Sequence, residues 1–140
     1  MAQRARGIRI MNFYVADTHG LYWYLIASPL LGVNAKNAFD EGKNGNAIIY
    51  IPSIVIAELY FLNKKHGEQI DFAVELARLE NSPQFKFVGF NAADVKDFTV
   101  DAAVPEMHDR IIVGVARRLS AACLTRDAKI VDSKIVKIIW

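Results

Sequence analysis

Near its start the chain reads Asn12-Phe13-Tyr14-Val15-Ala16-Asp17-Thr18, in which a short apolar run meets an acid and a hydroxyl residue. The apolar run has the length and residue types of a buried β-strand. Asp17 and Thr18 are typical of a helix start, because their side-chain oxygens can accept hydrogen bonds from free backbone N–H groups. The stretch therefore predicts a strand over residues 12–16 that leads directly into a helix.

The same alternation of strand and helix continues along the chain. Further strands are expected at residues 47–51, 84–90, 122–125 and 136–140. The helix that starts at Asp17-Thr18 is expected to continue over residues 21–27, and further helices are expected over residues 33–41, 53–65, 68–80, 92–98 and 105–120. Continuous apolar strands that alternate with helices are typical of a parallel sheet covered on both faces. We therefore predict an α/β fold: a three-layer α/β/α sandwich with a mostly parallel sheet of four to five strands.

Composition indicates one globular domain. The 140 residues are 53% hydrophobic and 23% charged, which excludes a disordered or fibrous chain. Three of the 17 Lys and Arg residues lie in the first ten residues, so the rest of the chain carries 14 basic against 15 acidic groups. The bulk charge thus shows no broad basic surface for nucleic acid. We expect a basic, disordered N-terminal tail over residues 1–10 and one domain over residues 11–140.

The chain is expected to be soluble and cytoplasmic. Residues 18–35 contain no Asp, Glu, Lys or Arg, but Pro29 and several polar residues interrupt this stretch. A membrane span needs about 20 mostly apolar residues, so we expect no membrane partner. Cys123 is the single cysteine and can form no internal disulfide, which favours a reducing compartment.

Four acids are expected at one edge of the sheet. Asp17 and Asp127 follow the first and fourth strands, and the carboxyl ends of parallel strands share one edge, where ligands bind. Glu58 and Asp109 each lie one turn into a helix. Taken singly, these acids have simpler interpretations as helix caps, dipole partners, turn residues or members of ion pairs. Placed together they repel one another, and hard divalent cations are the usual remedy.

Four blocks of sequence carry a resemblance that covers residues 12–140. They read Val15-Ala16-Asp17-Thr18-His19-Gly20-Leu21-Tyr22-Trp23-Tyr24-Leu25, Pro52-Ser53-Ile54-Val55-Ile56-Ala57-Glu58-Leu59, Pro105-Glu106-Met107-His108-Asp109-Arg110-Ile111-Ile112-Val113 and Leu124-Thr125-Arg126-Asp127-Ala128-Lys129-Ile130. In this order they resemble the PIN domain family, and in particular VapC-type toxins of toxin–antitoxin pairs. Many VapC sequences have Asp-Pro before the acid of the third block, where this chain has Met107-His108. A Pro-Glu-x-His-Asp-Arg version, as found here, also occurs among PIN proteins.

The resemblance implies a metal-dependent endoribonuclease that cleaves single-stranded RNA. It makes Asp17, Glu58, Asp109 and Asp127 an acidic quartet that is catalytic and binds Mg²⁺ or Mn²⁺. Asp17 and Asp109 are expected to be the most direct ligands, and Glu58 and Asp127 to be ligands or to position water. Thr125 matches a small hydroxyl position near the metal. The resemblance also implies a homodimer and a small antitoxin protein, whose peptide lies in a groove of the toxin.

Basic and aromatic residues near these blocks are candidates for substrate or partner contacts. Arg110 and Arg126 are the expected RNA contacts, and the wider set of residues that can touch phosphate adds Lys64, Lys65, Arg117 and Arg118, although such residues are more often plain solvated charges. The adjacent Tyr22, Trp23 and Tyr24 point about 100° apart on a helix and cannot all face one core. The chain's next helix, a protein interface or base stacking can each account for them.

Several other functions are excluded by missing motifs. The turn after the first strand, Asp17-Thr18-His19-Gly20, lacks the glycine pattern of a dinucleotide-binding site and that of a P-loop. Pro52-Ser53 stands where a receiver domain needs its phosphoacceptor Asp, and no Cys or Ser has the partners of a nucleophile. Two alternatives stay open: a PIN nuclease in RNA processing without an antitoxin, and a non-catalytic PIN-like scaffold. The complete quartet argues against the scaffold.

Overall fold

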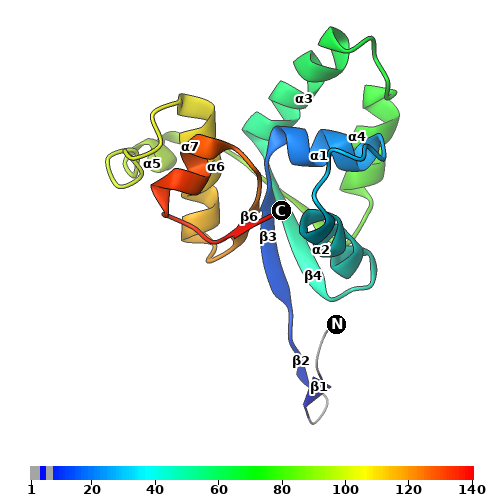
Figure 1. Cartoon of the computed structure of the whole chain (residues 1–140), viewed down its shortest axis with the longest axis horizontal. Helices are drawn as coiled ribbons and strands as arrows, with labels where there is room; N and C mark the ends of the chain where they lie inside the picture. The colour runs from blue at the N-terminus through cyan, green and yellow to red at the C-terminus, as the bar shows by residue number, and fades with distance from the viewer. Residues whose placement is uncertain (1–3, 6–7) are drawn as a thin grey trace.

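The chain, seen in a computed structural model that describes residues 4–5 and 8–140, is built on a five-stranded parallel sheet (Figure 1). In order across the sheet, the strands are β5 (Phe85–Val88), β4 (Ala47–Pro52), β3 (Asn12–Ala16), β6 (Ala122–Leu124) and β7 (Ile138–Ile139). Each neighbouring pair of these strands runs parallel. The predicted parallel sheet is therefore confirmed.

Seven helices lie within the described residues. They are α1 (Thr18–Leu25), α2 (Val33–Lys43), α3 (Ser53–Lys65), α4 (Phe72–Glu80), α5 (Ala92–Val95), α6 (Met107–Arg118) and α7 (Ala128–Ser133). Six of them match helices expected from the sequence. The seventh, α7, differs from the sequence prediction, which indicated only a turn at Arg126-Asp127 before the last strand.

Acidic N-caps explain three helix starts that differ from those expected from the sequence. The Asp71 side chain accepts a hydrogen bond from the backbone in the first turn of α4, so this helix begins at Phe72 and not at residue 68. Glu106 caps α6 in the same way, so this helix begins at Met107, two residues after the expected start. Asp127 caps α7, which is too short for a helical periodicity to show in the sequence.

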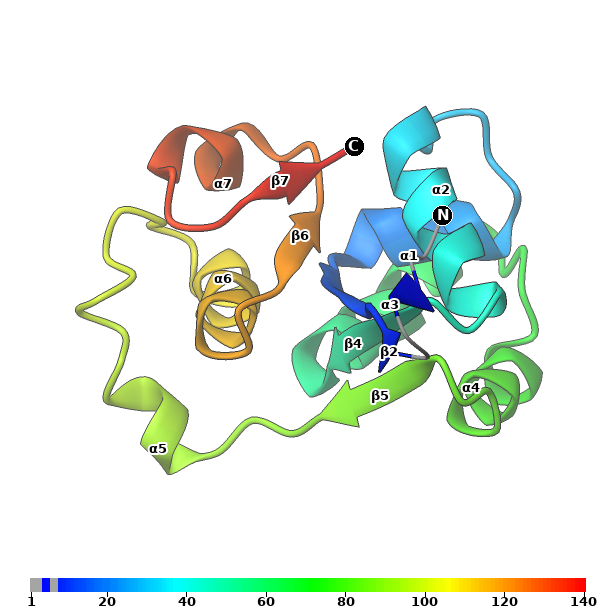
Figure 2. The ribbon, with the colours of Figure 1, turned by 90° about the horizontal axis from the view of Figure 1, so that it is seen from below.

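The helices cover both faces of the sheet, which confirms the three-layer arrangement (Figure 2). Helix α6 packs against β3 and β6 on one face, and α1 and α2 lie on the other, with α2 against β4. Helix α3 contacts β4, α1 and α6. Central residues such as Val15, Ile49 and Leu124 are fully buried. In register, Ala16 pairs with Leu124, so the carboxyl ends of β3 and β6 lie side by side.

The three adjacent aromatic residues of α1 have different surroundings. Tyr22 is buried, and Tyr24 stacks on Phe39 of α2 with the ring centroids 4.1 Å apart and the planes within 6°. The chain's own next helix therefore covers one of the three rings. Trp23 remains partly exposed beside the ring of Trp140, with the two centroids 5.7 Å apart.

Half of the expected tail over residues 1–10, namely residues 1–3 and 6–7, lies outside the described residues. In its described part, β1 (Arg4–Ala5) pairs antiparallel with β2 (Ile8–Arg9). Among the helices of the described chain, none combines the length and the apolar character that crossing a membrane requires.

Candidate active site

Asp17 lies at the point where β3 ends and α1 begins. Its side chain caps the helix by accepting a hydrogen bond of 2.7 Å from the backbone N–H of Gly20. A Cβ atom on residue 20 would lie 2.8 Å from Asp17 Oδ1 and 2.9 Å from the Leu124 carbonyl oxygen, so only glycine allows this close approach. The helix-cap interpretation is thus confirmed, and the cap fixes the carboxylate at the carboxyl edge of the sheet.

Asp127 has the matching place after β6. One of its oxygens accepts a hydrogen bond of 3.0 Å from the Ile130 N–H and so caps α7. Its own N–H donates to the hydroxyl of Thr125 at 3.0 Å. Thr125 is fully buried, and its side chain also hydrogen-bonds Asp17. The hydroxyl of Thr125 therefore links the two acids that follow the central strands.

Asp109 lies in the first turn of α6, as the sequence predicted. Its backbone N–H donates to Glu106 Oε2 at 2.7 Å. The other oxygen of Glu106 lies 2.6 Å from His108 Nδ1, and that nitrogen is 3.7 Å from Glu58 Oε2. Glu106 and His108 thus connect α6 to the acid on α3.

Glu58 projects from α3 and meets the start of α1. The hydroxyl of Thr18 donates a hydrogen bond of 2.6 Å to Glu58 Oε1. Thr18 is buried, so the donor end of this bond is shielded from water, whereas the Glu58 side chain is 33% exposed and faces the pocket. Sequence analysis treated Thr18 only as part of a helix start, because a contact between residues 40 positions apart leaves no local pattern.

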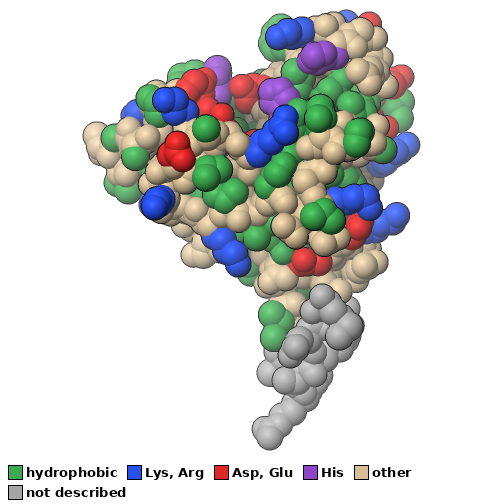
Figure 3. Space-filling model, in the orientation of Figure 1, with side chains coloured by type: hydrophobic (Ala, Val, Ile, Leu, Met, Phe, Trp, Pro, Cys, Tyr) green, Lys and Arg blue, Asp and Glu red, His purple; other side chains and the backbone are tan. Residues whose placement is uncertain are grey.

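All four quartet acids line one pocket of about 590 Å³. Its wall is completed by side chains of α1, α3 and α6, including Thr18, His19, Phe61, Lys65 and His108. Figure 3 shows acidic and histidine side chains beside each other at the upper edge of the molecule, where α6 and α3 approach. The structure thus brings together the four acids that the sequence analysis placed at this edge of the sheet.

The acids influence one another electrostatically. Burial raises the pKa of Asp17 to about 6, and the charges of Asp127 and Glu58 add to this effect. Burial also raises the pKa of Asp109 to about 6, with further contributions from Asp127, Glu106, Glu58 and Asp17. A carboxyl group whose pKa is raised in this way holds its negative charge at a cost in free energy, which a nearby cation would offset.

The donor set suits a hard divalent cation, whose preferred protein ligands are carboxylate oxygens. Among the described residues, no group of three or more His, Cys, Asp or Glu side chains is already arranged to coordinate a metal ion. Hydrogen bonds from neighbouring hydroxyl and backbone groups hold the oxygens of Asp17, Glu58 and Asp127. The fit to a metal therefore rests on the chemistry of the acids and on their mutual repulsion.

The two expected RNA-contacting arginines have different surroundings. Arg110 donates to the carbonyl oxygens of Val104, at 2.7 Å, and Phe98, at 3.2 Å, and thereby ties α6 to the preceding segment. Arg126 is exposed, and its guanidinium carbon lies 4.6 Å from the centroid of the Trp23 ring. Only Arg126 of the two lines a pocket that contains quartet acids.

Of the other basic candidates for phosphate contacts, three are held in ion pairs and one lies near the quartet. Arg117 and Arg118 form ion pairs with three acids of the segment before α6, namely Asp94, Asp97 and Asp101. Lys64 pairs with Glu68 on the molecular surface. Lys65 lines the pocket of the quartet, so it joins Arg126 as a positive group near the acids.

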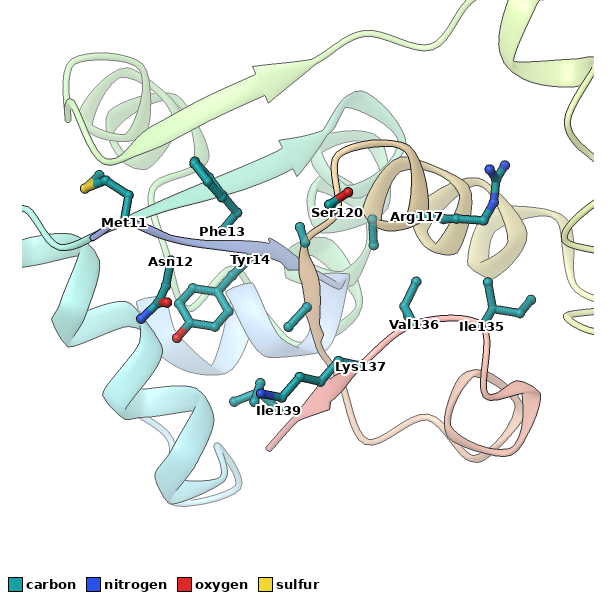
Figure 4. A pocket seen from close by; sticks show the side chains of 13 residues that line it. Met11, Asn12, Phe13, Tyr14, Arg117, Ser120, Ile135, Val136, Lys137 and Ile139 are labelled. Atoms are coloured by element: carbon teal, nitrogen blue, oxygen red, sulfur yellow. The ribbon is translucent and has the colours of Figure 1, made fainter. Parts of the chain in front are cut away.

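A pocket of about 460 Å³ lies at the opposite edge of the sheet. It is lined by the first residues of β3, the end of α6 and the segment around β7 (Figure 4). It contains none of the quartet acids, and its one arginine, Arg117, is bound to Asp101. Because ligand sites in parallel sheets lie at the carboxyl edge, the pocket of the quartet is the better candidate active site.

Comparison with known families agrees with this geometry. The PIN domain family model matches residues 14–134 of the chain, a range that includes all four quartet acids. The chain belongs to the PIN domain family. PIN domain proteins are nucleases, so the family assigns this chain to the hydrolases that act on nucleic acids. No curated protein matched the sequence.

Solved structures of PIN domain proteins share the fold. VapBC2 from Rickettsia felis, bound to a DNA fragment from its promoter, has a TM-score of 0.66 and 17% identity, over 90% of this chain and 96% of that chain. FitAcB from Neisseria gonorrhoeae has a TM-score of 0.61 and 19% identity, over 89% and 95%. PAE2754 from Pyrobaculum aerophilum has a TM-score of 0.60 and 18% identity, over 91% and 83%. At these identities the likeness shows the PIN fold.

Proposed function

We propose that this PIN domain is a metal-dependent endoribonuclease that cleaves single-stranded RNA and serves as the toxin of a VapBC-type toxin–antitoxin pair. One observation carries the nuclease part of the proposal: four carboxylates from four separate elements line one pocket at the carboxyl edge of the sheet. Two of them have a raised pKa, because each is buried near the others. Helix capping accounts for Asp17 and Asp127 one at a time, but it gives no reason to gather four carboxylates in one pocket.

The acidic quartet would hold the metal, which we propose to be Mg²⁺ or Mn²⁺. Asp17 and Asp109, the acids with the raised pKa values, are the proposed direct ligands. Glu58 and Asp127 are proposed as further ligands or as groups that position water. When bound, such an ion stabilises charge on a phosphate and lowers the pKa of a coordinated water.

The surrounding residues hold the acids in place for this task. Backbone N–H groups in the first turns of α1 and α7 fix one oxygen each of Asp17 and Asp127, and Thr18 fixes one oxygen of Glu58. Fixed carboxylates need no reorganisation when substrate binds, which favours catalysis. Lys65 and Arg126 supply positive charge near the acids and are placed to attract the phosphate backbone of RNA.

The toxin part of the proposal concerns partners. The structural relatives include VapBC2 and FitAcB, which are complexes, and this supports an antitoxin partner for the present chain. Phe61 on α3 is 70% exposed and lines the pocket of the quartet, so a partner peptide with an apolar side chain can pack there beside the acids. We also propose a homodimer and a cytoplasmic location, as the resemblance to VapC implies.

Cleavage of a labelled single-stranded RNA tests the nuclease. The wild-type protein is compared with Asp17→Asn and with Asp132→Asn, a matched change at an exposed acid outside the pocket. We expect cleavage with Mg²⁺ or Mn²⁺ that EDTA stops, that Asp17→Asn abolishes and that Asp132→Asn leaves intact. Cleavage by Asp17→Asn at the wild-type rate would contradict the assigned site. A folded protein that neither cleaves RNA nor binds metal would favour the non-catalytic scaffold.

The toxin assignment needs a separate test, because an RNA-processing nuclease would pass the first one. We expect production of the wild-type chain to arrest growth of its host and Asp17→Asn to be harmless. Production of a small protein from a gene directly upstream should restore growth by binding the chain. Growth unaffected by an active nuclease would favour the processing enzyme.

A further inference from the structure

A third pocket, of about 320 Å³, adjoins the pocket of the quartet, with which it shares Asp17, His19 and Asp127. Besides these two acids it is lined by His19, Trp23, Arg126 and Trp140. Since Asp17 and Asp127 line both pockets, a linear polymer bound at the quartet can extend directly into this neighbouring pocket. We call it the tryptophan pocket.

The tryptophan pocket presents several flat π surfaces close together. The rings of Trp23 and Trp140 meet edge to face with their centroids 5.7 Å apart, and the His19 ring lies 5.2 Å from that of Trp23. The planar guanidinium of Arg126 lies over both tryptophans, 4.6 Å and 5.9 Å from the two centroids. Nucleobases stack on aromatic rings and on arginine planes of this kind.

The charge of Arg126 is available to a ligand. Within the described part of the chain no carboxylate forms an ion pair with this guanidinium, whereas Arg117 and Arg118 are both paired. A stacked arginine keeps its N–H groups free to donate at its edge. The tryptophan pocket therefore combines a stacking surface with a free donor for a phosphate oxygen.

The backbone holds Trp140 at this place through a tight contact. The N–H of Asn34 donates to the Trp140 carbonyl oxygen at 3.2 Å. A Cβ atom on Gly32 would lie 2.5 Å from the carbonyl carbon of Trp140 and 2.6 Å from its ring, so a larger residue at 32 would force Trp140 to move. Gly32 and Asn34 thus position the second ring from the start of α2 without lining the pocket.

We infer that the tryptophan pocket binds an unpaired nucleobase of the RNA substrate, next to the phosphate held at the acidic quartet. This inference rests on the proposed nuclease function and deepens it, because it gives the enzyme a subsite for a base. Stacking tolerates every base, so the subsite selects single-stranded over paired RNA more than it selects a sequence. An acidic peptide is the alternative occupant, since it can use Arg126 but has no need of the stacked rings.

Tryptophan fluorescence reports on this pocket alone. The chain contains two tryptophans, and both line it. In EDTA, which prevents metal-dependent cleavage, we expect a six-nucleotide single-stranded RNA to quench the fluorescence in a saturable way. A six-unit abasic ribose phosphate should quench much less, because it has the charge and no bases. Equal quenching by the two, or quenching by an acidic peptide and not by RNA, would overturn the inference.

A pair of glycine variants tests the same inference without removing a ring. Gly32→Ala displaces Trp140, whereas a Cβ on the exposed Gly89 meets no atom within 4 Å. We expect Gly32→Ala to weaken RNA quenching and to raise the KM for RNA cleavage about tenfold, the effect of losing one stacking contact. Gly89→Ala should leave both unchanged. Circular dichroism and the melting temperature establish that both variants are folded.

The two measurements separate this inference from the proposed function. If the wild type cleaves RNA, but quenching does not depend on bases and Gly32→Ala has a normal KM, the base subsite is refuted and the proposed nuclease function stands. If quenching depends on bases but no RNA is cleaved, the inference that the pocket binds a base stands and the proposed nuclease function is refuted. If neither cleavage nor base-dependent quenching is observed, the nuclease function and the base subsite are both refuted.

Discussion

The negative charge of Asp17 lowers the stability of the metal-free protein. Its pKa is raised from 3.8 to about 6, chiefly by burial. The protonated form is thus favoured in the folded state, so the group's stabilising contribution is complete below about pH 4 and is lost as the pH rises through about 6. At pH 7 the ionised carboxylate therefore lowers the free energy of unfolding.

Replacing Asp17 by Asn should consequently stabilise the metal-free protein while abolishing cleavage. The Asn side-chain oxygen can still cap α1, and at pH 7 we expect the free energy of unfolding to rise by about 1–3 kcal/mol. Urea unfolding in EDTA at pH 7 and pH 4 checks this, because the gain should shrink at the lower pH. Asp132→Asn, at an exposed site, provides the control. A loss of stability at pH 7 would refute the argument.

Thr18 should act through Glu58. Its hydroxyl donates the hydrogen bond of 2.6 Å that orients this carboxylate, and Thr18→Val removes the donor while keeping the shape. A hydrogen bond to a charged group contributes about 1.5–3 kcal/mol, so we expect kcat/KM for RNA to fall at least about tenfold. Thr18→Ser retains the hydroxyl and should remain near the wild type. Equal activities of the Val and Ser variants would show that this bond does not matter.

At the scale of helices and strands, the sequence predicted the elements that have long apolar or periodic patterns. The strand at residues 12–16 and the helix at 53–65 appear with the expected bounds. Helix α7 was not predicted, because its six residues are too few to show a helical periodicity of apolar residues. The capping residue Asp127 is its one signal in the sequence. The quartet was predictable since each acid follows a strand or opens a helix. The hydrogen bond of Thr18 to Glu58 and the place of Trp140 beside Asp17 and Asp127 were not predictable, because each brings together distant parts of the chain.

The salt bridge between Arg117 and Asp101 should be important for the placement of α6. Asp101 is buried and receives hydrogen bonds of 2.8 Å and 3.1 Å from the guanidinium. Arg117→Ala would leave this carboxylate buried and unpaired, so we expect a loss of about 3 kcal/mol in the free energy of unfolding. Lys36→Ala, which breaks an exposed pair with Asp40, should cost much less. Similar losses in urea unfolding of the two variants would contradict this role.

At the scale of the whole molecule, the two edges of the sheet have different tasks. The carboxyl edge gathers the quartet, Lys65, Arg126 and the tryptophan pocket, whereas the amino edge is occupied by ion-paired and apolar groups. The chain outside its first ten residues has nearly balanced charge. Affinity for RNA must therefore come from this one edge rather than from a broad basic surface. A cation at the quartet would strengthen it, because it offsets the repulsion between the acids and the RNA phosphates.

Metal binding should accordingly stabilise the entire fold. A ligand at 100 times its Kd adds about 2.7 kcal/mol to the stability of a protein that binds it only when folded, which is about 10 °C in Tm for a chain of this size. We expect Mn²⁺ or Mg²⁺ to produce such a rise at pH 7.5 in the wild type and in Asp132→Asn, and none in Asp17→Asn. Because the carboxyls must be ionised to hold the ion, and Asp17 and Asp109 have a pKa of about 6, the rise should diminish below pH 6 and be small at pH 5. Thermal melts with and without EDTA measure it. A rise that persists in Asp17→Asn, or that is the same at pH 5 and pH 7.5, would place the ion away from the quartet.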